Sequence, residues 1–193
     1  MKTSTKIVTI VTIALIWGTL ACNAPLGASG KPSEAVLPSD EALASFHSKW
    51  RALNLATPSG PFTLTFTEAE LTSAVDAAIR EAEADGADIP FEDVQVQLAN
   101  GAINVYGTVH MPPLAFSGLI TIVPTIGPNG TVEITITRIE FGPLEFDSAT
   151  FDQLAAAVEQ SINAPIVASP FHITLSAISI ANGELTISGT ITP

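Results

Sequence analysis

An α+β domain with a curved antiparallel sheet is the fold class that the sequence predicts, and three observations predict it. Segments with an apolar residue every three or four positions occur between segments in which apolar and polar residues alternate singly. Asn-Gly, the strongest short hairpin signal, joins two alternating segments at 100–101 and again at 182–183. The chain of 193 residues is long enough for one ordinary domain and a leader. We expect a sheet of about six or seven strands that wraps two amphipathic helices, with an extra N-terminal helix.

Residues 1–21 have the pattern of a secretory signal peptide. Lys2 and Lys6 precede an uncharged apolar run, Ile7–Leu20, and the small residue Ala21 follows it. The run is shorter than the ~20 residues that span a hydrocarbon core, so we expect cleavage rather than a permanent membrane span.

Cys22 is the single cysteine of the chain and directly follows this signal. Thr19-Leu20-Ala21-Cys22 resembles the lipobox of bacterial lipoproteins, which implies a diacylglyceryl anchor on Cys22, although the leucine stands one residue closer to the cysteine than usual. A lone cysteine in an exported protein has no internal disulfide partner, so lipidation also explains its presence. The sequence therefore predicts an extracytoplasmic lipoprotein of the bacterial cell envelope, with an ordinary cleaved signal peptide as the alternative.

Residues 22–38 are rich in Pro, Gly, Ser and Ala without an apolar period, which is typical of a flexible linker. Such a linker would hold a single domain at 39–193 roughly 20 to 25 Å from the lipid. The net charge of −12 excludes nucleic acid as a partner, because a polyanion would be repelled. The same charge would hold the domain away from an anionic bilayer.

Three segments have helical periodicity, at about 40–55, 68–83 and 148–163. Ser39 is a suitable N-cap for the first helix, and Thr67 with Glu70 forms a capping box for the second. The last two helices carry apolar stripes that are expected to face the sheet. The stripe residues are Leu71, Val75, Ile79, Phe151, Leu154 and Val158.

The alternating segments are the predicted strands, at about 62–66, 93–99, 102–110, 119–123, 131–141, 171–181 and 184–192. The hairpin sequence LANGAINVYGTV at 98–109 is similar to IANGELTISGTI at 180–191, and a helical segment precedes each. This similarity predicts an internal helix-hairpin repeat.

Met111–Phe116 is an unbroken apolar stretch with two prolines. Proline cannot donate a ladder hydrogen bond, so the stretch is not a central strand. We interpret it as a buried crossover, and the alternative is an apolar lip that contacts a membrane or a lipid chain. Leu114 and Phe116 from this stretch join the candidate cavity residues.

The order of the segments FTEAELTSAVDAAI, DVQVQLANGAINVYGTV, EFGPLEF and FHITLSAISIANGELTISGTI resembles the LmeA-like phospholipid-binding proteins of bacterial envelopes. More loosely, it is similar to the YpmS-type lipoproteins. The resemblance covers about residues 61–192 and implies a fold related to tubular lipid-binding domains. It also implies a lipid ligand, with phospholipid acyl chains held in a cavity between the helices and the sheet. The alternative is an envelope assembly module with a solid core and a protein partner.

No catalytic motif is visible in the sequence. It contains no HExxH, no GxSxG nucleophile elbow and no GxxxxGK phosphate loop, and its three histidines are far apart. We therefore expect a non-enzymatic protein without a cofactor. A hydrolase built from scattered residues remains as a third alternative.

One acidic stretch has the ligand spacing of a calcium-binding loop. Its potential ligands are Glu81, Glu83, Asp85 and Glu92. Glutamates replace the shorter usual side chains at the first two positions, and Pro90 with a strand follows where a helix is usual. These residues are thus a weak candidate for Ca²⁺, and a solvated helix end is the simpler interpretation.

Overall fold

The computed structural model describes residues 26–27, 32, 35–55, 59–84, 86, 91–111, 113–143, 152, 155–156, 159–160, 162–163, 166–167 and 171–192. Its helices with assigned bounds are α2 (Asp40–Leu55) and α3 (Glu68–Ala84). Its strands are β1 (Leu26–Gly27), β2 (Gly60–Thr67), β3 (Phe91–Ala99), β4 (Ala102–Met111), β5 (Leu114–Ile126), β6 (Val132–Phe141), β7 (His172–Ala181) and β8 (Glu184–Thr192).

The strands form two sheets rather than the single curved sheet that the sequence predicts. The larger sheet has the antiparallel order β6-β5-β4-β3, and the smaller has the antiparallel order β2-β8-β7. Neither sheet is closed or strongly curled. The last hairpin pairs through β8 with β2, a strand from the beginning of the domain, and these three strands form the second sheet. The α+β class is confirmed, whereas a sheet wrapped around the helices is not observed.

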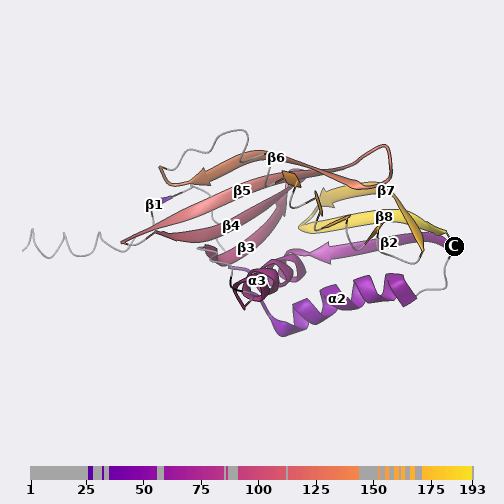
Figure 1. The fold of residues 1–193 in the computed structure, drawn as a ribbon, viewed down its shortest axis with the longest axis horizontal. Coiled ribbons are helices and arrows are strands. Elements are labelled where there is room, and N and C mark those ends of the chain that lie inside the picture. The colour runs from indigo at the N-terminus through magenta and orange to yellow at the C-terminus, as the bar shows by residue number, and fades with distance from the viewer. Residues whose placement is uncertain are drawn as a thin grey trace, which may run out of the picture.

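The two sheets follow each other along the long axis of the molecule (Figure 1). They meet where the N–H of Leu175 in β7 donates to the carbonyl oxygen of Gly130, at 3.0 Å. One hydrophobic cluster runs through both sheets, and its buried members include Phe66, Val96, Ile134 and Ile187. The chain thus has one core although it has two sheets.

The predicted N-terminal caps of α2 and α3 are confirmed. Ser39 Oγ accepts a hydrogen bond from the N–H of Ala42, at 3.2 Å. In the capping box, Glu70 Oε2 accepts from the N–H of Thr67 at 2.8 Å, and Thr67 Oγ1 accepts from the N–H of Glu70 at 3.3 Å. These bonds satisfy backbone donors that lack partners within the helix.

Both Asn-Gly pairs form the predicted hairpin turns. Asn100 and Gly101 have φ angles of 56° and 75°, and Asn182 and Gly183 have 55° and 76°. Two successive positive φ angles define a type I′ turn, whose twist matches that of the flanking strands. The two turns therefore have the same backbone conformation.

Helix side chains hold the outer edges of the larger sheet. On the β3 edge, Thr72 Oγ1 accepts from the N–H of Val96 at 2.9 Å, and Glu68 Oε1 accepts from the N–H of Leu98 at 2.7 Å. On the β6 edge, Glu159 and Asn163 bond to the backbone of Ile134 and Val132, at 2.6 to 2.9 Å. Exposed strand edges pair readily with other chains, and these side chains occupy the groups that such pairing would use.

Met111–Phe116 is a hairpin and not a buried crossover. Met111 at the end of β4 pairs with Leu114 at the start of β5, and Pro113 lies in the turn between them. The chain can reverse here because a turn needs no ladder hydrogen bond from proline. Leu114 is 50% exposed, whereas Phe116 is buried with 4% exposure.

Two residues of the predicted flexible linker belong to the sheet. Leu26 and Gly27 form β1, which pairs in parallel with Phe116 and Ser117 of β5. The predicted signal peptide and Cys22 lie outside the described residues.

The third predicted helix is described only in part. Phe151, Leu154 and Val158 lie outside the described residues. The described positions between 152 and 167 are helical, and among them Ile162 and Ile166 pack on the hydrophobic cluster.

Candidate functional site

The apolar stripe of α3 is half-buried. Leu71, Val75 and Ile79 pack on the hydrophobic cluster and remain partly accessible. The sequence predicts that this stripe is the buried face of the helix. The most buried side chains of α3 are instead polar, namely Glu70, Thr72 and Ser73. They can be buried because each has hydrogen-bond partners within the protein.

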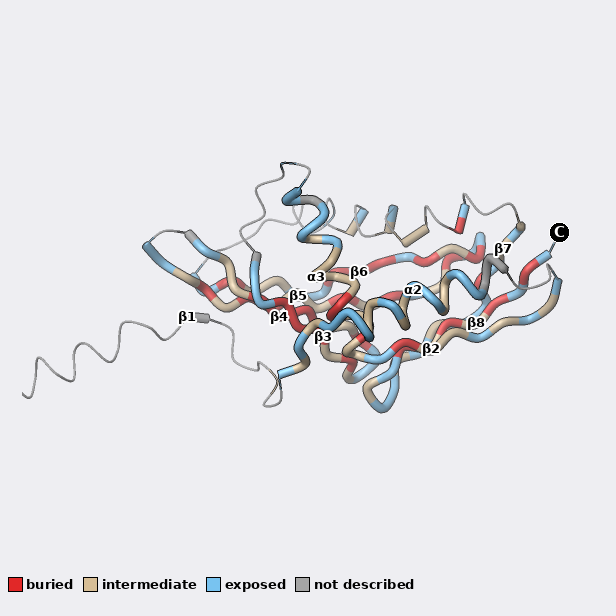
Figure 2. The backbone as a smooth tube through the Cα atoms, turned by 90° about the horizontal axis from the view of Figure 1, so that it is seen from below, coloured by how far each residue is buried: buried red, intermediate tan, exposed pale blue. Residues whose placement is uncertain are grey.

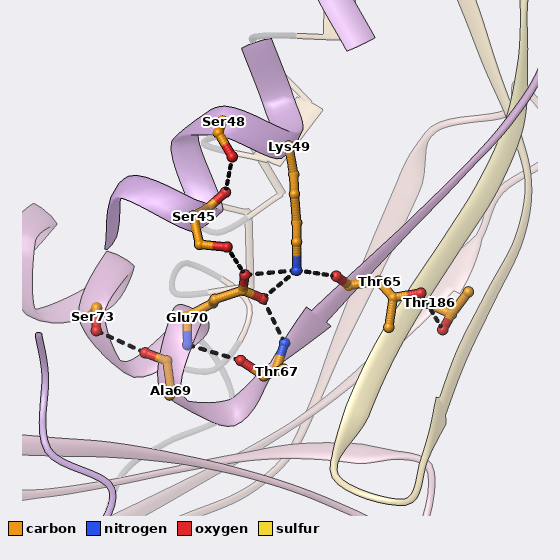
Figure 3. Close-up of polar contacts among 9 residues, drawn as sticks. All are labelled: Ser45, Ser48, Lys49, Thr65, Thr67, Ala69, Glu70, Ser73 and Thr186. Atoms are coloured by element: carbon orange, nitrogen blue, oxygen red, sulfur yellow. Dashed lines mark hydrogen bonds and ion pairs between the residues drawn. The ribbon is translucent and has the colours of Figure 1, made fainter. Parts of the chain in front are cut away.

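Glu70 is the centre of a polar network that joins α2, α3 and β2 (Figure 3). Its Oε1 accepts a hydrogen bond from the Ser45 hydroxyl at 2.5 Å. Lys49 Nζ lies 2.6 Å from Oε1 and 2.7 Å from Oε2 of the same carboxylate. Lys49 Nζ also donates to the carbonyl oxygen of Thr65 in β2, at 2.6 Å. Lys49 therefore joins α2 to α3 through an ion pair and to β2 through a hydrogen bond.

The pKa of Glu70 lies below its ordinary value. Burial acts in the opposite direction and is the largest single effect, because it disfavours the charged carboxylate. The bonds from Lys49, Ser45 and the Thr67 N–H together outweigh it, with a smaller contribution from the charge of Lys49. The carboxylate is consequently held ionised by its partners, which suits a structural ion pair.

Aromatic contacts also join α2 to β2. The rings of Phe46 and Trp50 on α2 lie 5.2 and 5.6 Å from the ring of Phe66 on β2. No described side chain of α2 is itself fully buried, and Figure 2 shows this helix as intermediate and exposed. Helix α2 therefore rests on the surface of the domain through two aromatic side chains and one ion pair.

Two shallow grooves flank α2, with volumes of about 330 and 280 Å³. None of the five predicted cavity residues that the structure describes lines either groove. The first groove is lined by Asp40, Leu43, Ala44, His47 and Arg51, and the second by Pro38, Ser39, Asp40, Leu43, Ser73, Asp76, Ala77 and Arg80.

A match to a protein-family model covers residues 52–190, and the model is described as LmeA-like phospholipid-binding. The chain belongs to this family. The searches with this chain found no matching curated protein and no matching solved structure. The resemblance expected from the sequence is thereby confirmed.

The part of the chain that matches the LmeA-like family begins near the end of α2. Ser45 and Lys49, which bind Glu70 from α2, therefore lie outside the matched residues, whereas Glu70 lies inside them. Nothing in the sequence pattern links Lys49 to Glu70, because their pairing depends on how two helices cross. The capping box did identify Glu70, although for a local role.

Five of the eight predicted cavity residues of this LmeA-like protein lie in the described part of the chain. Leu71, Val75 and Ile79 share the half-buried face of α3, and Phe116 is buried in the larger sheet. Leu114 lies at the exposed β4–β5 turn.

The calcium candidate falls partly outside the described residues, because Asp85 is not among them. Glu81 and Glu83 are exposed on α3, and Glu92 lies in β3 with its carboxylate 3.3 Å from His110 Nε2. Among the described residues, no group of three or more His, Cys, Asp or Glu is placed to hold a metal ion. Within the same residues, no helix is long and apolar enough to span a membrane.

Proposed function

We propose that this protein is a lipid-anchored, extracytoplasmic phospholipid binder that holds acyl chains against the apolar face of α3 without catalysing a reaction. Membership of the LmeA-like phospholipid-binding family carries this proposal. The signal-like segment and Cys22 support the location in the bacterial envelope, with a diacylglyceryl group on Cys22 as the anchor.

The burial pattern of α3 supports the position of the ligand. The helix is held by polar bonds from Glu68, Glu70 and Thr72, and the last two of these side chains are buried. Its apolar side chains are therefore not all needed to dock the helix. Leu71, Val75 and Ile79 contact the core on one side and remain accessible on the other, as the wall of an apolar ligand site requires.

The test begins with the chain carrying Cys22→Ser, exported from a bacterial host and purified without detergent. Native mass spectrometry and organic extraction should recover a phospholipid bound in stoichiometric amount. A protein recovered without lipid would contradict the proposal and favour the alternative, an assembly module with a solid core. The next step would then be to search for its protein partner.

Val75→Trp tests the position of the site within the same preparation. A bulky ring at this half-buried position should occupy the ligand site and reduce the lipid recovered, while the free energy of unfolding changes by less than about 1 kcal/mol. Arg80→Trp is the matched control, because the Arg80 side chain is 72% exposed on the same helix. If Val75→Trp retains the full amount of lipid, or costs ~1 to 3 kcal/mol by overpacking, the α3 face is not the site.

A further inference from the structure

The β4–β5 turn presents apolar side chains at one end of the molecule. Pro113 and Leu114 are exposed, and the next inward-facing residue of β5, Phe116, is buried. Figure 1 shows β1 and the beginning of β5 at the end of the long axis opposite the C-terminus. We call Pro113 and Leu114 the hairpin tip.

The direction of β1 relates this tip to Cys22. Because β1 runs parallel to β5, the chain enters Leu26 from the side on which β5 begins, which is the side of Leu114. Three residues separate Cys22 from Leu26, and the four residue steps between them reach at most about 14 Å when fully extended. This length is the largest distance that the sequence allows between the residue that would carry the lipid and Leu26, whose partner Phe116 is two positions after Leu114.

Among the described residues, Glu92 carries a negative charge at this end, and it is set back from the tip. Glu92 pairs in the ladder with Thr108, three residues before Met111, which corresponds to roughly 10 Å along a strand. Its carboxylate lies 3.3 Å from His110 Nε2. At physiological ionic strength a separation of about 8 to 10 Å screens much of the repulsion between an exposed carboxylate and anionic headgroups. Glu92 therefore does not prevent the tip from approaching a bilayer, although the chain as a whole is strongly acidic.

We propose that the hairpin tip inserts into the headgroup region of the bilayer that holds Cys22, so that the molecule stands on the membrane by this end. The proposal rests on the anchoring part of the proposed function. A single exposed leucine binds a bilayer weakly, but a neighbouring anchor makes its insertion intramolecular and raises its effective concentration.

The experiment places a tryptophan at the tip of the full chain. Leu114→Trp is produced in a bacterial host and reconstituted into vesicles of phosphatidylcholine and phosphatidylglycerol with brominated acyl chains, which quench tryptophan on contact. Leu37→Trp is the matched control, because Leu37 is also exposed, at 71%, but precedes α2. We expect a blue shift and loss of fluorescence for Leu114→Trp beyond the background that Trp50 gives in both variants. Equal quenching of the two variants would overturn the proposal.

Two additions keep this result separate from the proposed function. The intact mass reports whether Cys22 carries diacylglycerol, and where it does not, coupling Cys22 to a maleimide lipid supplies the anchor. Failure of lipidation would then contradict the proposed anchoring while the tip is still tested. Leu26→Pro removes a backbone donor from β1, so it should lower the quenching of Leu114→Trp to the control level. Unchanged quenching would show that β1 does not orient the tip.

Discussion

Glu70 connects a strand end and two helices through one carboxylate. Its side chain is 6% exposed and that of Lys49 is 32% exposed, so the pair is partly shielded from water. Buried pairs of this kind contribute modestly as a unit, but they are costly to break from one side. Two predictions follow from the contact between Lys49 and Glu70.

Lys49→Met should lower the free energy of unfolding by about 2 kcal/mol, because it leaves the Glu70 carboxylate buried without its cation. The double variant Lys49→Met/Glu70→Gln should recover part of this loss, since a neutral amide needs no counter-ion. Chemical denaturation measures both. Arg80→Met is the control, because it removes an exposed pair with Asp76 and should change the stability by less than about 1 kcal/mol. A double variant no more stable than Lys49→Met would contradict this account.

The lowered pKa of Glu70 predicts the pH dependence of stability. A carboxyl group that binds its proton less readily when folded stabilises the fold above its ordinary pKa, near 4.5, and this contribution disappears as the pH falls through the folded value. The wild-type protein should therefore lose stability on acidification in this range, and Glu70→Gln should show a shallower loss. Denaturation experiments between pH 7 and pH 3 measure the free energy of unfolding of both proteins. If the two free energies fall equally with pH, Glu70 is not the group responsible.

At the scale of elements, α3 docks on the larger sheet through hydroxyl and carboxylate groups. Thr72 is fully buried, and its hydroxyl accepts the N–H of Val96 at the sheet edge. This contact explains why a polar residue occupies the most enclosed position of an amphipathic helix. The apolar stripe indicated which side of α3 approaches the core, but not that polar groups lie deepest.

Thr72→Val should cost about 1 to 3 kcal/mol, because valine has the same shape and leaves the Val96 N–H without an acceptor. Thr137→Val is the control, since its hydroxyl is exposed and bonds at 3.4 Å to the Thr121 carbonyl oxygen. The control should change the free energy of unfolding by no more than about 0.5 kcal/mol. Thermal and denaturant unfolding measure both variants, and similar effects for the two would argue against a role for the edge contact.

Local signals explain how much of the element pattern could be predicted. Ser39, the Thr67–Glu70 capping box and the two Asn-Gly turns each act within four residues, and all lie where the sequence indicates. The partner of β8 could not be predicted in this way. Its pairing with β2 joins residues more than a hundred positions apart, and alternating sequences do not specify which strand they pair with.

At the scale of the whole molecule, contacts between distant segments of the chain were also the part of the candidate site that the sequence could not predict. The sequence identified the apolar residues of α3, and the family match supports a lipid ligand. It did not indicate the Lys49–Glu70 contact or the pairing of Leu26 with Phe116, because both join segments that approach each other only in the folded chain. Leu26 lies in the predicted linker, and the structure places it in a strand of the larger sheet.

The two protected edges of the larger sheet also differ in when they become protected during synthesis. Helix α3 precedes β3 in the chain, so its edge contacts are available as soon as that strand is made. The β6 edge is covered only after Glu159 has been synthesised, and this residue is 25 positions beyond Ile134. A chain that emerges from its N-terminus therefore carries an open strand edge at β6 until this later segment appears. Premature pairing between newly made chains would begin at β6 rather than at β3.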